Sequence, residues 1–402
     1  MFTHLFKLIW NKKKQNFLLM MEIFFSFIGL FAGFTFVLYP YNNYKIPNGF
    51  EDKNVWVVNL TRSSPEKFLN GTDKIENVDS LEIFRESVKK VLLSINGVED
   101  VTYSSVNFPY SSNGFNAPIK YNGKEAWGNL NTVEDNYQKV LSMKMREGRW
   151  FSSDDKVSTV RPIVINQALK IKLFGDEDAL GKIVETDVAT EKMKIVGVVT
   201  DTKDESEYEV PASGLFRRMD TGDLRNDYSI LMKVKPGADA TFESAVHKTL
   251  SNTIRNANIE IEHLSDMKEA RNKVMLVPFI IFLIIAGFLL INVALGIFGV
   301  LWYNIHRRKA EIGLRRAVGA TGKAISWQLV TEAILLATLS LILGSFFAVQ
   351  FPLLKSFDLP ANNYIVAIIY SILSIYVLVI LCALYPGRQA AGIYPATALH
   401  ED

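Results

Sequence analysis

Four long apolar segments constrain the fold of this chain more than any other feature of its sequence. They cover residues 17–39, 274–303, 325–354 and 364–386, and Glu22 and Glu332 are the charged residues within them. Each segment has the roughly 20 apolar residues needed to cross about 30 Å of hydrocarbon. The first segment lacks the small-x-small cleavage pattern of a signal peptide. The sequence therefore predicts four transmembrane helices, the first an uncleaved anchor.

The charges in the connecting stretches predict the orientation of these helices. Four lysines lie between residues 7 and 14, and the connection at 304–324 holds six basic residues against Glu311 alone. The positive-inside rule places both stretches in the cytoplasm. Four crossings then place the C-terminal tail inside as well. Residues 41–273, with 32 basic and 36 acidic side chains, are predicted to lie outside.

These observations predict a membrane protein with four transmembrane α-helices and a large α+β domain inserted between helices 1 and 2. The predicted membrane helices are 17–40, 274–303, 325–354 and 364–386. The predicted outer parts are the domain at 41–273 and a loop at 355–363. The predicted cytoplasmic parts are an N-terminal segment at 1–16, a loop at 304–324 and a tail at 387–402.

The outer domain shows a strand–helix–strand pattern twice. Its strands are expected at 54–60, 98–105, 228–234 and 258–263, with helices at 79–95 and 242–254. Two such units commonly pair into one ferredoxin-like layer. We therefore predict an α/β subdomain of residues 41–106 and 226–266. It is interrupted by a mostly β insertion at 107–225, with strands at 161–166, 182–186 and 192–200, a helix at 167–174 and a loop at 104–116.

The second membrane helix is predicted to be longer than a bilayer requires. Helical spacing begins at residue 267 and continues to 303, which gives about 55 Å at 1.5 Å per residue. Residues 267–273 are therefore expected to form a stalk outside the membrane. The first helix is expected to end sooner, at Pro40, because proline disrupts the interior of a helix.

The cytoplasmic loop is predicted to contain a short amphipathic helix. Arg307, Glu311 and Arg315 are spaced four residues apart and would form a charge ladder on one face. Gly319 is expected to end this helix and Thr321 to cap the next one. An apolar stripe is expected on another face, formed by Ala310, Leu314, Ala317 and Val318. The helix either lies on anionic lipid headgroups or docks into a groove on a cytoplasmic partner.

The inner loop reads RKAEIGLRRAVGAT at 308–321 and is followed by Gln328 and Glu332. Together with a closing motif at 385–399, in which Gln389 replaces a usual basic residue, it resembles the signature of the MacB/FtsX-like permeases of ABC transporters. Short motifs at 148–151, 162–166, 173–176, 181–182 and 195–198 resemble the MacB-type periplasmic core. No resemblance is recognised for residues 109–129.

The resemblance implies that the inner helix couples to a separate ABC ATPase, which would bind ATP and magnesium, while this chain would bind no cofactor. It further implies a unit of two ATPases and two permeases, the second permease being the same or a related chain. The implied coupling residues are Arg307, Arg308, Glu311, Ile312, Gly313, Leu314, Arg315, Arg316, Gly319 and Ala320. Membrane lipid, a periplasmic adaptor and an outer-membrane channel are further expected partners, and the expected location is the bacterial inner membrane.

Efflux of peptides, drugs or other hydrophobic compounds is the first expectation, with lipoprotein release or control of a cell-wall hydrolase as alternatives. A transmembrane sensor would need a cytoplasmic output domain, and a membrane enzyme would need catalytic motifs that the sequence lacks. The glycine-containing stretch at 175–182 departs from the ATP-binding loop, because Ile183 replaces its Ser or Thr. Glu22 and Glu332 are more simply expected to snorkel or pair within the bundle.

The composition argues against a nucleic-acid-binding protein and against a protein built on disulfides or cysteine-bound zinc. A balance of 44 basic against 42 acidic residues argues against nucleic-acid binding as the main task. The single cysteine, Cys382, excludes intrachain disulfides and cysteine-based zinc sites, and no catalytic or metal-binding constellation is predicted.

Overall fold

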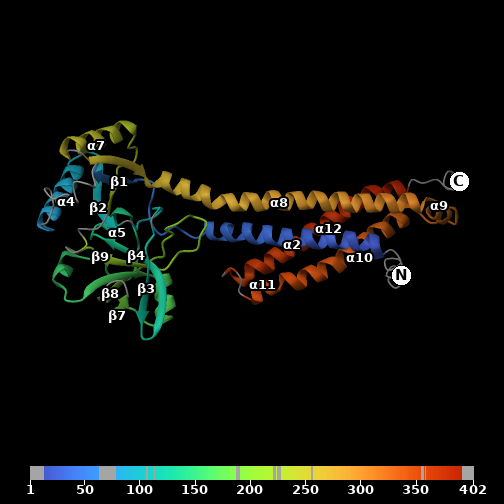
Figure 1. Cartoon of the computed structure of the whole chain (residues 1–402), viewed down its shortest axis with the longest axis horizontal. Coiled ribbons are helices and arrows are strands. Elements are labelled where there is room, and N and C mark those ends of the chain that lie inside the picture. Colours follow the sequence, from blue (N-terminus) through green and yellow to red (C-terminus); the bar gives the residue numbers. More distant parts are fainter. Residues whose placement is uncertain are drawn as a thin grey trace, which may run out of the picture. The chain divides into compact units, whose positions relative to one another are not determined.

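The computed structural model describes residues 13–62, 78–105, 107–112, 114–186, 191–220, 223, 228–254, 257–354, 357 and 359–391. The chain divides into two compact units (Figure 1). The membrane unit comprises the chain up to residue 42 and from residue 276 onward, and the outer unit comprises residues 43–275. Predictions for the N-terminal segment before residue 13 and for the tail beyond residue 391 lie outside the described residues.

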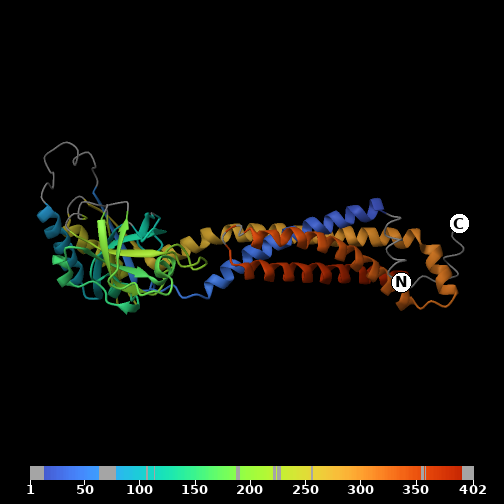
Figure 2. The same cartoon turned by 90° about the horizontal axis from the view of Figure 1, so that it is seen from below.

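The membrane unit is built from four helices that are long and apolar enough to cross a membrane. They run side by side in two perpendicular views (Figures 1 and 2). The long helices are α2 (Lys13–Tyr44), α8 (Leu264–Arg307), α10 (Gly322–Ala348) and α12 (Ala361–Ala391). Two short helices accompany them, α9 (Lys309–Ala317) and α11 (Gln350–Leu353).

Small residues allow α2 to approach its neighbours closely. A Cβ atom at Gly29 would lie 2.2 Å from Leu289 Cδ1 of α8, and one at Gly33 would lie 3.3 Å from Ala286 Cβ. A Cβ atom at Gly344 of α10 would lie 2.5 Å from the ring of Phe27. Close backbone approach through glycine is a common way for membrane helices to gain packing contacts.

Two predicted helix ends are wrong. Helix α2 does not end at Pro40 but continues to Tyr44, with Pro40 inside it. Proline removes only one backbone donor, so neighbouring contacts can carry a helix past it. Helix α8 is also longer than predicted, with 44 residues, or about 66 Å. The predicted third membrane helix corresponds to one candidate span, Gly322–Leu353, in which α10 ends at Ala348 and α11 follows after Val349.

The first part of the outer unit is an antiparallel sheet in the order β11-β1-β10-β2. Its strands are β1 (Val55–Arg62), β2 (Val98–Ser105), β10 (Tyr228–Val234) and β11 (Ala257–His263). Helix α4 (Val78–Leu93) follows β1 and α7 (Ala240–Thr253) follows β10. Alternate residues point to opposite faces, so Trp56 and Val58 join the core under these helices while Val55 and Val57 join a second core. The predicted strands and helices of this part are present.

The second part of the outer unit is a closed ring of six strands. Each strand pairs with the next in the order β4-β3-β7-β8-β6-β9, and β9 pairs back to β4 in parallel. The ring strands are β3 (Asn116–Tyr121), β4 (Lys124–Val133), β6 (Arg161–Asn166), β7 (Ile183–Thr186), β8 (Glu191–Val199) and β9 (Gly214–Arg218). The accompanying elements are α5 (Tyr137–Val140), β5 (Met145–Gly148), a 3₁₀-helix (Ser153–Val157) and α6 (Gln167–Phe174). Leu169 and Leu173 of α6 pack into the core of the ring.

Four strands of this part were not predicted: β3, β4, β5 and β9. The hairpin of β3 and β4 turns at Asn122 and Gly123, both of which have positive φ angles of 46° and 79°. An Asn-Gly pair at such a turn is a strong hairpin signal. Strand β3, the turn and the first half of β4 fall within residues 109–129, the stretch in which no family-like motif was found from the sequence.

Candidate functional site

Helix α9 lies between two membrane helices and is defined by a break at each end. Helix α8 ends at Arg307, and Arg308 leaves the helical conformation with φ −105° and ψ 15°. At the other end Gly319 has a φ of 103°, a conformation that favours glycine. The predicted cap at Thr321 is confirmed, because its side chain accepts a hydrogen bond from Ala324 N.

One face of α9 is anchored by apolar packing. Ile312 is 6% exposed and belongs to a cluster with Ile305 of α8, Ile325 and Leu329 of α10, and Ala390 of α12. Gly313, the next residue, is also buried. The helix is therefore fixed on three membrane helices through one isoleucine.

A polar network joins α9 to the first turns of α10. Arg308 Nη1 lies 3.4 Å from Glu332 Oε2, and Arg315 Nη1 donates to Gln328 Oε1 at 3.0 Å. Gln328 Nε2 donates to Glu332 Oε1 at 3.3 Å, and Arg315 pairs with Glu311. We call these five residues the α9–α10 network. Because hydrogen bonds are directional, this network fixes the angle of α9 as well as its position.

The predicted charge ladder is wrong in one member. Arg307 ends α8 and is exposed, while Arg308 contacts Glu311 at 4.0 Å and pairs with Glu332. Four-residue spacing aligns side chains only within one unbroken helix, and the break at Arg308 interrupts it. Glu332, expected either to snorkel or to pair within the bundle, pairs with Arg308 at the start of α9 and accepts from Gln328 of α10. The Glu22 carboxylate lies against Gly296 of α8, where a Cβ atom would be 2.1 Å from its Oε2.

The opposite face of α9 presents apolar side chains to the surroundings. Leu314 is 56% exposed and Val318 is 82% exposed, and Ala310 and Ala317 are exposed beside them. The predicted apolar stripe therefore forms, but it does not pack on the rest of the chain. Exposed contiguous apolar groups mark contact sites for proteins or membranes.

The predicted coupling residues thus divide into three groups. The exposed ones are Arg307, Glu311, Leu314 and Gly319. The half-buried ones are Arg308, Arg315, Arg316 and Ala320, and the buried ones are Ile312 and Gly313. A partner could contact the first group directly, whereas the last group anchors the helix. The anchoring partners Ile305, Ile325, Leu329 and Ala390 were not predicted, because they come from three separate helices.

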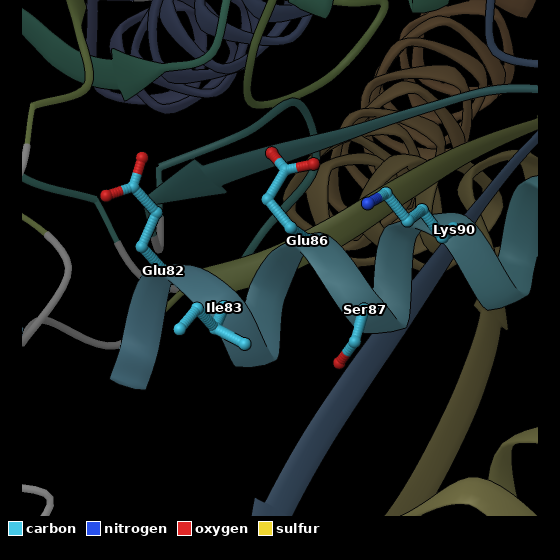
Figure 3. A pocket seen from close by; sticks show the side chains of 5 residues that line it. All are labelled: Glu82, Ile83, Glu86, Ser87 and Lys90. Carbon is cyan, nitrogen blue, oxygen red and sulfur yellow. The ribbon is translucent and has the colours of Figure 1, made fainter. Parts of the chain in front are cut away.

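Two cavities of the structure lack a recognisable catalytic arrangement of side chains. A cavity of about 170 Å³ beside α9 is lined by Trp302, Ile305, His306, Lys309 and Gln389. Another of about 330 Å³ lies along α4, where Glu82, Glu86 and Lys90 project from one side of the helix and Ile83 and Ser87 from another (Figure 3). Among the residues that the structure describes, no group of three His, Cys, Asp or Glu side chains could hold a metal ion.

The family-like motifs of the outer unit have structural roles. A Cβ atom at Gly148 would lie 2.3 Å from Val196 O, and one at Gly197 would lie 2.2 Å from Arg149 O. The two glycines therefore let β5 and β8 pass closely. Arg149 next to them forms two hydrogen bonds of 2.7 Å with Asp155, which lower the pKa of that carboxyl group.

Two family profiles match the chain. The profile of the MacB-like periplasmic core domain matches residues 28–249, more than half of the 402 residues. The profile of the FtsX-like permease C-terminal domain matches residues 282–395, which include α9.

Similar proteins carry permease names. The chain is 26% identical to an uncharacterized ABC transporter permease of Bacillus subtilis, YvrN, over 67% of this chain and 69% of that protein. It is 26% identical to the macrolide export ATP-binding/permease protein MacB of Campylobacter jejuni over 65% of this chain and 42% of that protein. It is 24% identical to the MacB of Neisseria gonorrhoeae over 87% of this chain and 56% of that protein. The chain thus spans about half the length of these MacB proteins.

Among solved structures, the periplasmic region of MacB from Actinobacillus actinomycetemcomitans matches 55% of this chain and 92% of its own length. The identity is 16% and the TM-score is 0.38.

Proposed function

The chain belongs to the ABC transporter permease family with a MacB-like periplasmic core domain and an FtsX-like permease domain, and on this premise we propose that it is the transmembrane subunit of a mechanotransmitting ABC system. In this proposal an ABC ATPase subunit binds α9 from the cytoplasm. ATP binding and hydrolysis there move α8 and α10, and through them the outer unit. ATP and magnesium belong to the ATPase, and this chain holds no cofactor of its own.

The observation that carries the proposal is the construction of α9. Its inner face is fixed by Ile312 and by the α9–α10 network, while Leu314 and Val318 stay exposed. A helix that only rested on lipid would need no such polar fastening to α10. A helix that transmits the movement of a bound partner needs an exposed apolar face to bind that partner and a rigid attachment to the membrane helices.

The wider assembly follows from the family. We propose two ATPase subunits and a second permease, identical or related, in the inner membrane of a Gram-negative bacterium, with contacts to membrane lipid. The basic residues of the α8–α10 connection support cytoplasmic termini and a periplasmic outer unit. The strand order β11-β1-β10-β2 with its two helices supports the ferredoxin-like arrangement for the first part of the outer unit.

For the substrate, we propose peptides, drugs or other hydrophobic compounds, exported with a periplasmic adaptor and an outer-membrane channel. The support is that several relatives are named as macrolide exporters. Lipoprotein release and control of a cell-wall hydrolase are alternatives within the same family. A transmembrane sensor is the alternative from another class, and co-purification of a histidine kinase in place of an ATPase would favour it.

The test is capture of an ABC ATPase from native membranes with the tagged chain, followed by substitution of the exposed stripe. Leu314→Asp with Val318→Asp should lower ATPase binding by roughly a hundredfold, because charged groups would enter an apolar contact. Ile83→Asp on α4 is the matched control, since Ile83 is also an exposed apolar helix residue. Unchanged binding of the double variant would overturn the assignment of α9.

A further inference from the structure

The loop between β8 and β9 connects parts of the outer unit that are far apart in sequence. Its residues 203–208, here called the clamp loop, contact the last residues of α2 and the first turns of α8. These contacts all lie within residues 43–275 and so within the outer unit. The clamp loop thus contacts the ends of two helices that are long and apolar enough to cross a membrane.

Lys203 holds the end of α2. It is 1% exposed, and its Nζ donates to the carbonyl oxygens of Asn43 and Ile46 at 2.6 Å each and of Glu207 at 2.9 Å. These three bonds use all the donors of an ammonium group. The last carbonyl groups of a helix have no partner within it, and a cation there is favourable. Lys203 therefore completes α2 beyond Pro40 and binds it to the loop.

Further contacts fix the same end of α2 from the side. Asn43 Nδ2 donates to Tyr208 O at 3.0 Å. The rings of Tyr44 and Tyr208 stack with their centroids 5.7 Å apart. The last two residues of α2 are thus held by both ends of the clamp loop.

Glu207 holds the start of α8. Its backbone N donates to Asn272 Oδ1 at 3.1 Å, and its Oε2 accepts from Asn272 Nδ2 at 2.9 Å. Lys268, one turn earlier on α8, lies 3.5 Å from Glu207 Oε1 and 2.6 Å from Asp52 Oδ2. Asn48, just after α2, donates to Glu207 Oε1 at 3.2 Å. One glutamate therefore bridges α8 and the chain that leaves α2.

We propose that the clamp loop makes the outer ends of α2 and α8 move as one body, and that Lys203 and Glu207 are positioning residues of the coupling. This inference rests on the proposed function for its purpose, although the clamp itself is a property of the chain alone. A buried lysine is costly unless it is fully hydrogen-bonded. Directional bonds from one loop to both helices fix the relation between them, which sliding apolar contacts would not do. A displacement of α8 then reaches the outer unit as a movement of the whole unit.

The first experiment measures the distance between the two helix ends in the purified chain. Spin labels are placed on cysteines at Ile46 and Val274, which are 40% and 71% exposed, in a Cys382→Ala background. The unaltered clamp should give one narrow distance. Lys203→Met and Glu207→Ala should each raise the population with separated ends by roughly tenfold or more, because hydrogen bonds to charged groups are lost. Lys182→Met is the matched control, since Lys182 pairs with Glu177 within the outer unit and outside the clamp loop.

Two readouts separate positioning from simple folding. Glu207→Gln keeps an acceptor for Asn272 and should restore most of the narrow distance that Glu207→Ala loses. The unfolding temperature of the outer unit should be nearly the same in these two variants, whereas the distribution of the label distance should differ clearly between them. If the distance stays narrow in Lys203→Met and in Glu207→Ala, the clamp does not exist. If Glu207→Gln and Glu207→Ala give equally broad distributions of the label distance and equal losses of thermal stability, the role of Glu207 is only structural.

The second experiment uses the chain bound to its captured ATPase. The distance between the labels should be the same with ATP and with ADP, and in Lys203→Met it should change with the nucleotide. A shift of the unaltered distance on ATP addition would overturn the proposal, because the ends would not move as one body. Failure to capture an ATPase would contradict the proposed function, and the result on the chain alone would still decide the clamp.

Discussion

Helix α8 is fastened near both of its ends, and the two fastenings differ in what they leave exposed. At its C-terminal end, α9 uses Arg308 and Ile312 for attachment and keeps Leu314 and Val318 free. At its N-terminal end, Lys203 of the clamp loop is almost completely buried, and the polar groups of the loop bind other parts of the chain. The first region is suited to receive a partner, and the second is suited to hold two helices together. The ion pairs of the two regions are about equally buried, with side-chain exposures of 17% and 15% for Arg308 and Glu332 against 20% and 22% for Lys268 and Glu207. The exposed apolar side chains of α9 therefore distinguish the docking site from the joint.

The largest effect is expected from reversing a charge in the α9–α10 network. Arg308→Glu should place two carboxylates together at a half-buried site with Glu332, at a cost of about 3 kcal/mol. ATPase binding measured by co-purification should fall with it. The exchange Arg308→Glu with Glu332→Arg should recover part of both. If Arg308→Glu binds the ATPase normally, the network does not orient α9.

A pair of neighbouring apolar residues separates anchoring from docking. Ile312→Ala should destabilise the membrane unit by about 2 kcal/mol, because Ile312 is buried among three other helices. Leu314→Ala should leave thermal stability within about 0.5 kcal/mol and still weaken ATPase binding, because Leu314 is exposed. The comparison fails if the two variants lose stability equally.

Acid should loosen the clamp loop. Burial raises the pKa of Glu207, but hydrogen bonds from Asn48 and Asn272 and the charge of Lys268 lower it more, so its folded pKa lies below the ordinary value. A depressed acid pKa contributes stability above the unfolded value of about 4.3 and loses it as pH falls through the folded pKa. The label distance at Ile46 and Val274 should therefore broaden below about pH 4. Glu207→Gln should show a smaller pH dependence, and an equal one would assign the change to another group.

The smallest effect is expected from the exposed ion pair of Glu311 and Arg315 on α9. Glu311→Gln removes the ion pair with Arg315 and should cost about 0.5 kcal/mol, as exposed pairs four residues apart usually do. Arg307→Gln should cost less, because Arg307 ends α8 and is exposed. Thermal unfolding of both variants gives the comparison. A larger loss for Arg307→Gln would restore the ladder that the sequence predicted.

Sequence reasoning succeeded where a pattern is local. The lack of charge over long segments predicted the four membrane helices, and alternation or helical spacing predicted β2, β6, β10 and α6 with the observed bounds. The hairpin of β3 and β4 was missed because Pro118 and Gly128 weaken its alternation, although its Asn-Gly turn carried the signal.

The parts that could not be predicted depend on distant backbone. Lys203 lies in an acidic stretch that reads as an exposed loop, and two of its three partners are carbonyl groups 157 and 160 residues away. Carbonyl groups have no residue identity, so no sequence pattern marks them. Likewise, the helix break at Arg308 separates Arg307 from Glu311 and Arg315, and the sequence pattern does not mark this break.

Ring closure in the outer unit also has a practical consequence for handling the protein. Within the described residues, each of the six ring strands pairs with two ring neighbours along at least part of its length, so no ring strand is an edge strand over its whole length. The turn at Asn122 and Gly123 joins β3 to β4, and both of its residues are exposed. An epitope inserted there would lengthen a surface turn without opening the ring, which makes this turn a suitable place for a tag.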